Sequence, residues 1–113
     1  MDKHYSIESL REIAGGDEDF MAVVAHTFLD EIPPDLSALV EAVENDNKEL
    51  AYQFAHKMKP NLEMFGVDLV KDITTVEAWT RSSKSTAAIQ PQVDHIESTL
   101  HKVFEELRAD FAG

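Results

Sequence analysis

Apolar residues recur at intervals of three and four along most of the chain. The longest such run follows Pro91 and consists of Val93, Ile96, Leu100, Val103 and Leu107. This spacing places side chains on one face of an α-helix. No segment of the sequence shows the sustained alternation of polar and apolar residues that is typical of a half-buried strand. The pattern therefore predicts an all-α protein.

Capping and helix-breaking residues divide the N-terminal half into three expected helices. Ser6 can cap a short first helix, which ends at Gly15-Gly16. Acidic residues 17–19 favour the start of a second helix, and Pro33-Pro34 predicts that it ends at Ile32. We expect its apolar side to be core, namely Phe20, Val23, Val24, Thr27 and Phe28. The third helix then buries Leu36, Leu39, Val40 and Val43.

Three further helices are expected in the C-terminal part. Asp46 and Glu49 have the spacing of a capping box, so a fourth helix should begin there and run to about Phe65, with Gly66 as its stop. A fifth helix is marked by Leu69, Ile73, Val76 and Trp79. The polar loop 82–86 follows it, and the last helix, after Pro91, should run for about 20 residues.

The joints between these helices are short, which favours antiparallel neighbours. Each helix has one apolar stripe that must be buried against another helix. We therefore expect residues 1–113 to form a single domain, an antiparallel four-helix bundle with additional short N-terminal helices.

The charge of the chain restricts its partners. There are 22 acidic and 10 basic residues, for a formal net charge of −12, which disfavours nucleic acids and anionic membrane surfaces. The segment 48–84 is the exception, because it has six basic and five acidic residues. No apolar run approaches the ~18 residues of a membrane span, and the first residues lack a secretory signal, so we expect a cytoplasmic location.

The chain contains no cysteine, which excludes disulfides, a thiolate nucleophile and cysteine-ligated metal clusters. Nucleotide binding is disfavoured because no glycine-rich phosphate loop is present. A metal-binding helical bundle would need repeated Glu-x-x-His pairs, and none occurs. Glu97 precedes His101 by four residues, and the histidines other than His56 are scattered, so we interpret them as surface residues.

His56 is the residue whose position and side chain most clearly suit it to take part in a reaction. On a helical wheel the apolar stripe of its helix consists of Ala51, Phe54, Met58, Leu62 and Phe65. His56 lies about 170° from the centre of that stripe, so its imidazole should face water. An imidazole nitrogen is a competent nucleophile near neutral pH. Its neighbours on the outer face are Tyr52, Lys57, Lys59, Pro60 and Glu63.

A phosphoryl group on His56 would add up to two negative charges, which nearby ammonium groups would oppose. An exposed ion pair contributes only about 0.2 to 1 kcal/mol, so Lys59 would tune the site rather than create its reactivity. Pro60 cannot donate to the carbonyl of His56, which predicts a kink just after the histidine.

Residues 55–66 resemble the motif of histidine-containing phosphotransfer (HPt) domains. In that family an exposed histidine is followed by lysine at the third position and glycine at the tenth, which Lys59 and Gly66 match. The resemblance covers nearly the whole chain, because Gly15–Phe20, Phe28–Asp30 and Asn45-Asp46 are similar to segments before the histidine helix. Two residues depart from the pattern: Pro60 stands where a small residue is usual, and Glu63 where a small or neutral one is common.

The resemblance implies a phosphorelay without turnover of its own. His56 would accept a phosphoryl group from the aspartyl phosphate of one response-regulator receiver domain, in a pathway fed by a hybrid sensor histidine kinase, and pass it to another receiver. The domain would be a monomer with no bound cofactor, because the receivers bring Mg²⁺ and most of the catalysis. The docking face would include Tyr52, Lys57, Pro60, Glu63 and Gly66, with Ile13 nearby. The alternative is a helical adaptor that binds partners without phosphotransfer.

Overall fold

The computed structural model describes residues 3–112, which form five α-helices and one 3₁₀ turn with no strand between them. The prediction of an all-α protein is therefore confirmed for this part of the chain. The described residues extend over 46 × 22 × 21 Å. The elements are α1 (Ile7–Ile13), α2 (Glu18–Glu44), α3 (Lys48–Met64), α4 (Val70–Thr80), η1 (Thr86–Ala88) and α5 (Gln90–Asp110).

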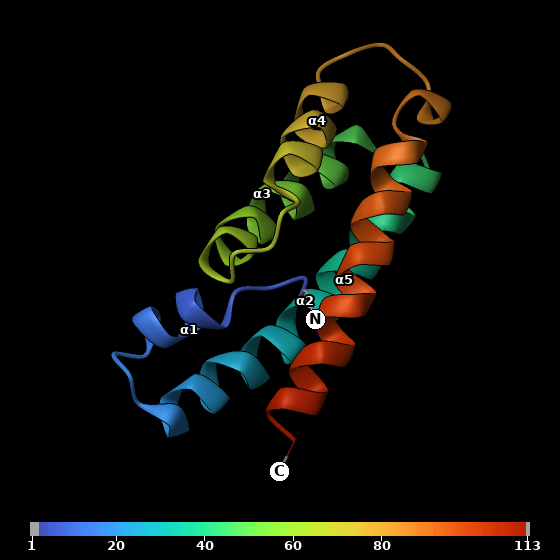
Figure 1. The fold of residues 1–113 in the computed structure, drawn as a ribbon. Coiled ribbons are helices and arrows are strands. Elements are labelled where there is room, and N and C mark those ends of the chain that lie inside the picture. Colours follow the sequence, from blue (N-terminus) through green and yellow to red (C-terminus); the bar gives the residue numbers. More distant parts are fainter. Residues whose placement is uncertain (1–2, 113) are drawn as a thin grey trace.

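The long helices run up and down the molecule (Figure 1). α2 and α5 extend along most of its length, while α3 and α4 pair with each other beside the upper half of α2. Direct contacts join α2 to α3, α3 to α4, α4 to α5 and α5 back to α2. The short α1 packs on α2 and α3.

Several helix boundaries agree with the sequence-based expectations. The Ser6 hydroxyl accepts a hydrogen bond from the Ser9 amide and begins α1, and the Asp17 carboxylate accepts one from the Phe20 amide and begins α2. After Met64, the left-handed backbone of Gly66 (φ +64°) stops the next helix. These ends depend on local capping, which is visible in the sequence.

The prediction of a chain break at Pro33-Pro34 is wrong. α2 continues through both prolines as one helix of 27 residues, so the expected second and third helices are a single element. Ile32 and Leu36, on either side of the prolines, are both buried in the core. An interior proline costs about 3 kcal/mol, but burying the apolar residues before and after the pair offsets this cost.

The predicted capping box at Asp46 is also wrong. Asp46 takes a left-handed conformation (φ +52°) that closes α2, and its amide donates to the carbonyl of Val43. The next residue, Asn47, caps α3 instead, with its side-chain oxygen accepting a hydrogen bond from the Leu50 amide. Asp46 therefore ends one helix, and a separate residue begins the next.

The core is one apolar cluster to which every helix contributes. On α2 it contains Met21, Ala25 and Phe28, whereas Phe20 and Val23, which we expected in the core, are 48% and 57% exposed. The first half of α2 therefore buries a side that contains Met21, Ala25 and Phe28 but leaves out Phe20 and Val23. These two apolar side chains of α2 are left at the surface.

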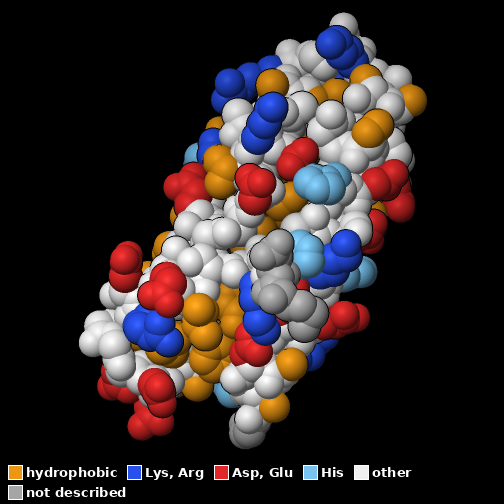
Figure 2. Space-filling model, viewed as in Figure 1, with side chains coloured by type: hydrophobic (Ala, Val, Ile, Leu, Met, Phe, Trp, Pro, Cys, Tyr) orange, Lys and Arg blue, Asp and Glu red, His pale blue; other side chains and the backbone are white. Residues whose placement is uncertain are grey.

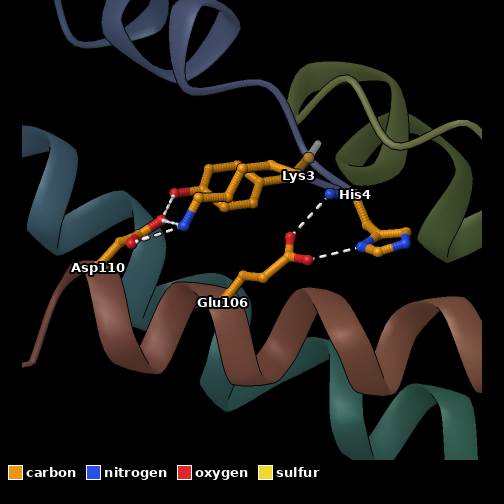
Figure 3. Close-up of polar contacts among 5 residues, drawn as sticks. Lys3, His4, Glu106 and Asp110 are labelled. Atoms are coloured by element: carbon orange, nitrogen blue, oxygen red, sulfur yellow. Dashed lines mark hydrogen bonds and ion pairs between the residues drawn. The ribbon is translucent and has the colours of Figure 1, made fainter. Parts of the chain in front are cut away.

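The chain's N-terminal segment is fastened to the end of α5 (Figure 3). Lys3 Nζ lies 2.8 Å from both carboxylate oxygens of Asp110, and the Tyr5 hydroxyl donates to the same group at 2.5 Å. The His4 backbone amide and its ring Nδ1 each contact one oxygen of Glu106, at 2.7 and 2.6 Å. We call these five residues the N-terminal clasp.

None of the helices within residues 3–112 is long and apolar enough to cross a membrane.

Candidate functional site

His56 lies near the middle of α3, on the face away from the core. Its neighbours Ala55 and Met58 are fully buried, whereas the His56 side chain is 67% exposed. The exposure predicted from the helical wheel is therefore observed. A ring in this position adds nothing to core packing, and it is open to reagents in solvent.

Glu77 of α4 is the partner of the histidine. Its Oε2 lies 3.1 Å from His56 Nδ1, and its Oε1 lies 3.1 Å from Lys59 Nζ. The Glu77 side chain is only 12% exposed. One buried carboxylate thus contacts two residues of the sequence motif, His56 and Lys59.

This contact selects the tautomer of His56. A carboxylate can only accept hydrogen bonds, so the proton of the neutral imidazole resides on Nδ1, where it is donated to Glu77. The other nitrogen, Nε2, then carries a free lone pair. The arrangement leaves a nucleophilic nitrogen on an exposed ring.

The pKa of Glu77 lies below its ordinary value. Burial by itself raises this pKa, but the hydrogen bonds from His56 and Lys59, with the positive charge of Lys59, outweigh it. Glu77 is therefore a carboxylate at neutral pH, and it remains available as an acceptor and a negative charge beside the ring.

Lys57 contacts a residue of α2 and not the histidine. Its Nζ lies 3.0 Å from Oδ1 of Asp35 on α2, and the Asp35 side chain is 8% exposed. Asp35 and Glu77 are the two buried charged residues among residues 3–112, and both bind side chains of α3 beside His56. The two carboxylates fasten this helix to α2 on one side and to α4 on the other.

The other predicted site residues differ in their surroundings. Tyr52, one turn before His56, stacks on its ring. Pro60 is exposed within α3, which continues through it. Glu63 is exposed and forms no ion pair with any residue in 3–112, since Lys59 binds Glu77 instead.

Gly66 has a structural reason for being glycine. Its φ is +64°, and a Cβ at this position would lie 2.6 Å from the Cβ of Ser6. The Ser6 amide also donates to the carbonyl of Phe65 at 2.7 Å. Gly66 therefore allows the segment before α1 to pack closely against the end of the histidine helix.

An apolar surface lies beside the same helix. Phe20 and Val23 of α2 and Met64 of α3, which is 41% exposed, line a hollow of about 260 Å³ between the two helices. Ile13 at the end of α1 is 37% exposed. We call Phe20, Val23 and Met64 the apolar strip. It begins two turns beyond His56 along α3.

Glu77 is the residue of this candidate site that the sequence did not reveal. It lies four residues after Ile73 and between Val76 and Trp79, so it is a charged residue within a stripe that was interpreted as core. Glutamate is rarely buried without a partner. A glutamate within an expected core stripe therefore indicates a buried ion pair, although the sequence does not identify which residue pairs with it.

The remaining histidines lie apart from this site. His95 Nδ1 contacts Asp72 at 3.2 Å, His4 contacts Glu106, and His26 contacts the carbonyl of Phe111. No group of three or more His, Asp or Glu residues that could hold a metal ion occurs within residues 3–112.

Comparisons of the chain with protein-family models, with curated proteins and with solved structures found no match.

Proposed function

We propose that this chain is a histidine phosphotransfer domain, in which His56 relays a phosphoryl group between the aspartates of receiver domains. The observation that carries the proposal is the exposed His56 ring, whose Nδ1 lies 3.1 Å from the carboxylate of the buried Glu77. The resemblance of residues 55–66 to the HPt motif supports the same function independently.

The chemical step is a transfer of phosphorus from oxygen to nitrogen. The lone pair of His56 Nε2 forms a bond to phosphorus while the bond between phosphorus and the aspartate oxygen of the donor breaks. The leaving group is the aspartate carboxylate, and the Nδ1 proton stays on the ring. The product is an imidazolium that carries the phosphoryl group, so positive charge develops on the ring during the step.

The surroundings of His56 match this charge development. Glu77 accepts the Nδ1 proton in a hydrogen bond that strengthens as the ring becomes positive. Lys59, 28% exposed, is held by the same carboxylate and provides a positive charge for the phosphoryl oxygens. Because the pKa of Glu77 is lowered, this pair of charges is present at neutral pH.

The fold and the surface also support the proposal. The helices α2 to α5 contact one another in a closed ring, as in an antiparallel four-helix bundle. We propose that a receiver domain docks on α3 and the apolar strip, where Phe20, Val23 and Met64 would bury apolar area against it. The Mg²⁺ and the remaining electrostatic stabilisation are then supplied by that partner.

The test is incubation of the protein with a phosphorylated receiver domain and Mg²⁺. We expect label on the wild-type protein that is lost in acid and stable in alkali, as a phosphoramidate is. His56→Gln should fold normally and accept no label.

Two outcomes would contradict the proposal. Label in His56→Gln at the wild-type level would overturn the site. If the folded wild-type protein took no label from a panel of receivers yet bound one of them, the chain would be the alternative, a helical adaptor.

A further inference from the structure

Two pairs of residues join α3 and α4 at successive turns. His56 on α3 faces Glu77 on α4, and one turn earlier on α3 Tyr52 faces Arg81, which lies one turn later on α4. Residues four apart share a helix face, so the two antiparallel helices keep both pairs in register. The second pair has no part in the phosphotransfer step described above.

Tyr52 covers one face of the His56 ring. The two rings are stacked, with centroids 5.5 Å apart and planes inclined by 11°. On the Tyr52 ring the Arg81 guanidinium carbon lies 5.5 Å from the centroid. Offset stacking and cation–π contacts of this kind are favourable. Arg81 forms no ion pair with a carboxylate of residues 3–112, so no salt bridge dictates its place against Tyr52.

The hydrogen bond to Glu77 cannot orient the ring alone. It fixes one atom, Nδ1, but a ring that is two-thirds exposed can still tilt about that contact. A parallel aromatic neighbour restricts this tilt, because turning the ring out of plane loses the stacking contact. Two constraints, one at an atom and one on the plane, are needed to fix the direction of the Nε2 lone pair, which lies in the ring plane.

We propose that Tyr52, braced by Arg81, is a positioning residue that fixes the plane of the His56 ring for phosphoryl transfer. This inference rests on the proposed function for its role in transfer, but the orientation of the ring can be measured without any phosphate donor. In-line transfer requires the nucleophile and the leaving oxygen to be aligned. A small misplacement of a reacting group lowers the rate severalfold or more.

A hollow at the surface beside Tyr52 and Arg81 shows that these two side chains are accessible from solvent. Its volume is about 630 Å³, and its lining includes Tyr52, Arg81 and Gln53. Substitution of Gln53, which is exposed and lies next to Tyr52 in the chain, is therefore a matched control. It alters the same hollow without removing the stacked ring.

The first measurement is the proton NMR spectrum of the His56 ring without any partner. In the wild-type protein its shifts should be displaced by the ring current of Tyr52. Tyr52→Leu should remove the displacement, whereas Tyr52→Phe and Gln53→Leu should keep it. Arg81→Gln should reduce it partially, since the brace is lost but the ring remains. Unchanged His56 shifts in Tyr52→Leu would show that Tyr52 does not orient the His56 ring, whatever the outcome for phosphotransfer.

The second measurement is single-turnover transfer from a phosphorylated receiver, with the affinity for that receiver measured in parallel. With the receiver at saturating concentration, we expect Tyr52→Leu to slow transfer about three- to tenfold, and Tyr52→Phe to restore the rate to within about twofold. An unchanged rate would overturn the positioning role. A weaker affinity with an unchanged rate would also overturn it, because Tyr52 would then be a docking residue. If the wild-type protein took no label, the proposed function would fail. The NMR spectra alone would then show whether Tyr52 orients the His56 ring.

Discussion

His56 and His4 make the same local contact at two different places in the molecule. In each, ring Nδ1 contacts a glutamate oxygen, at 3.1 Å for His56 and Glu77 and at 2.6 Å for His4 and Glu106. The surroundings differ. Glu77 also holds Lys59, and the His56 ring is stacked on Tyr52. Glu106 also binds the His4 backbone amide, which ties that histidine to α5.

The comparison shows that a histidine–carboxylate pair does not by itself define a phosphotransfer site. His4 is 40% exposed and belongs to a structural clasp that joins the N-terminal segment to α5, as Figure 3 shows. His56 is 67% exposed and lies in the part of the chain with no excess of acidic residues. Lysine and arginine side chains gather over α4 and the loop after it, at the upper end of the molecule in Figure 2. Greater ring exposure and a lysine bound to the same glutamate are what separate the His56 site from the His4 site.

The largest expected effect is the contrast between replacing these two histidines. His56→Gln should abolish labelling, because the nucleophilic nitrogen is gone, while His4→Gln should keep the initial labelling rate within about twofold. Initial rates with a phosphorylated receiver measure both. Loss of labelling in His4→Gln with intact helicity would break the distinction between the sites.

Replacing the glutamate partners of the two histidines should show the same contrast in transfer rate. Glu77→Gln should slow transfer about tenfold, since a hydrogen bond to a charged group is worth about 1.5–3 kcal/mol and the positive ring would lose its counter-charge. The matched variant Glu106→Gln should leave the rate unchanged. Single-turnover kinetics measure both rates, and equal rates in the two variants would show that Glu77 has no special role.

Gly66 links the clasp region to the histidine helix, and its replacement should affect stability. Gly66→Ala should lower the free energy of unfolding by about 2 kcal/mol, because a left-handed residue gains a Cβ that meets Ser6. Gly15→Ala has a similar φ of +62° but nothing within 4 Å of the added atom, so about 1 kcal/mol is expected there. Urea denaturation of both variants isolates the contact. Equal losses would mean that the close approach to Ser6 is not needed.

The smallest expected effect is on the clasp itself, through pH. Hydrogen bonds from Lys3 and then Tyr5 hold the pKa of Asp110 below its ordinary value of 3.8. A lowered folded-state pKa contributes stability that is present above the ordinary value and is lost as the pH falls through the folded value. Asp110→Asn should therefore cost about 0.5–1 kcal/mol at pH 7.

This cost should shrink toward zero as the pH is lowered below 3.8. Unfolding free energies of the wild-type protein and Asp110→Asn across this pH range provide the measurement. A difference that did not change with pH would mean that the Asp110 charge does not stabilise the clasp.

Several helix ends were predictable from local signals, although the local signals at Asp46 and at Pro33-Pro34 misled. The cap at Ser6, the acidic start of α2 and the stop at Gly66 depend on neighbouring residues, and the wheel around His56 needs only the helical period. The break at Pro33-Pro34 was predicted wrongly because a local cost was weighed without the core. Burial of Ile32 and Leu36 on both sides of the prolines outweighs that cost, and burial is not a local property.

By itself, the sequence determined that the chain is helical and that His56 faces solvent, because both follow from apolar spacing within one helix. Only the tertiary structure decided what surrounds the histidine. Glu77 is 21 residues away and Arg81 is four residues further, and both reach the site because α4 packs antiparallel to α3. The side-chain period places a residue on a face of its own helix, but helix packing decides which face of another helix it meets.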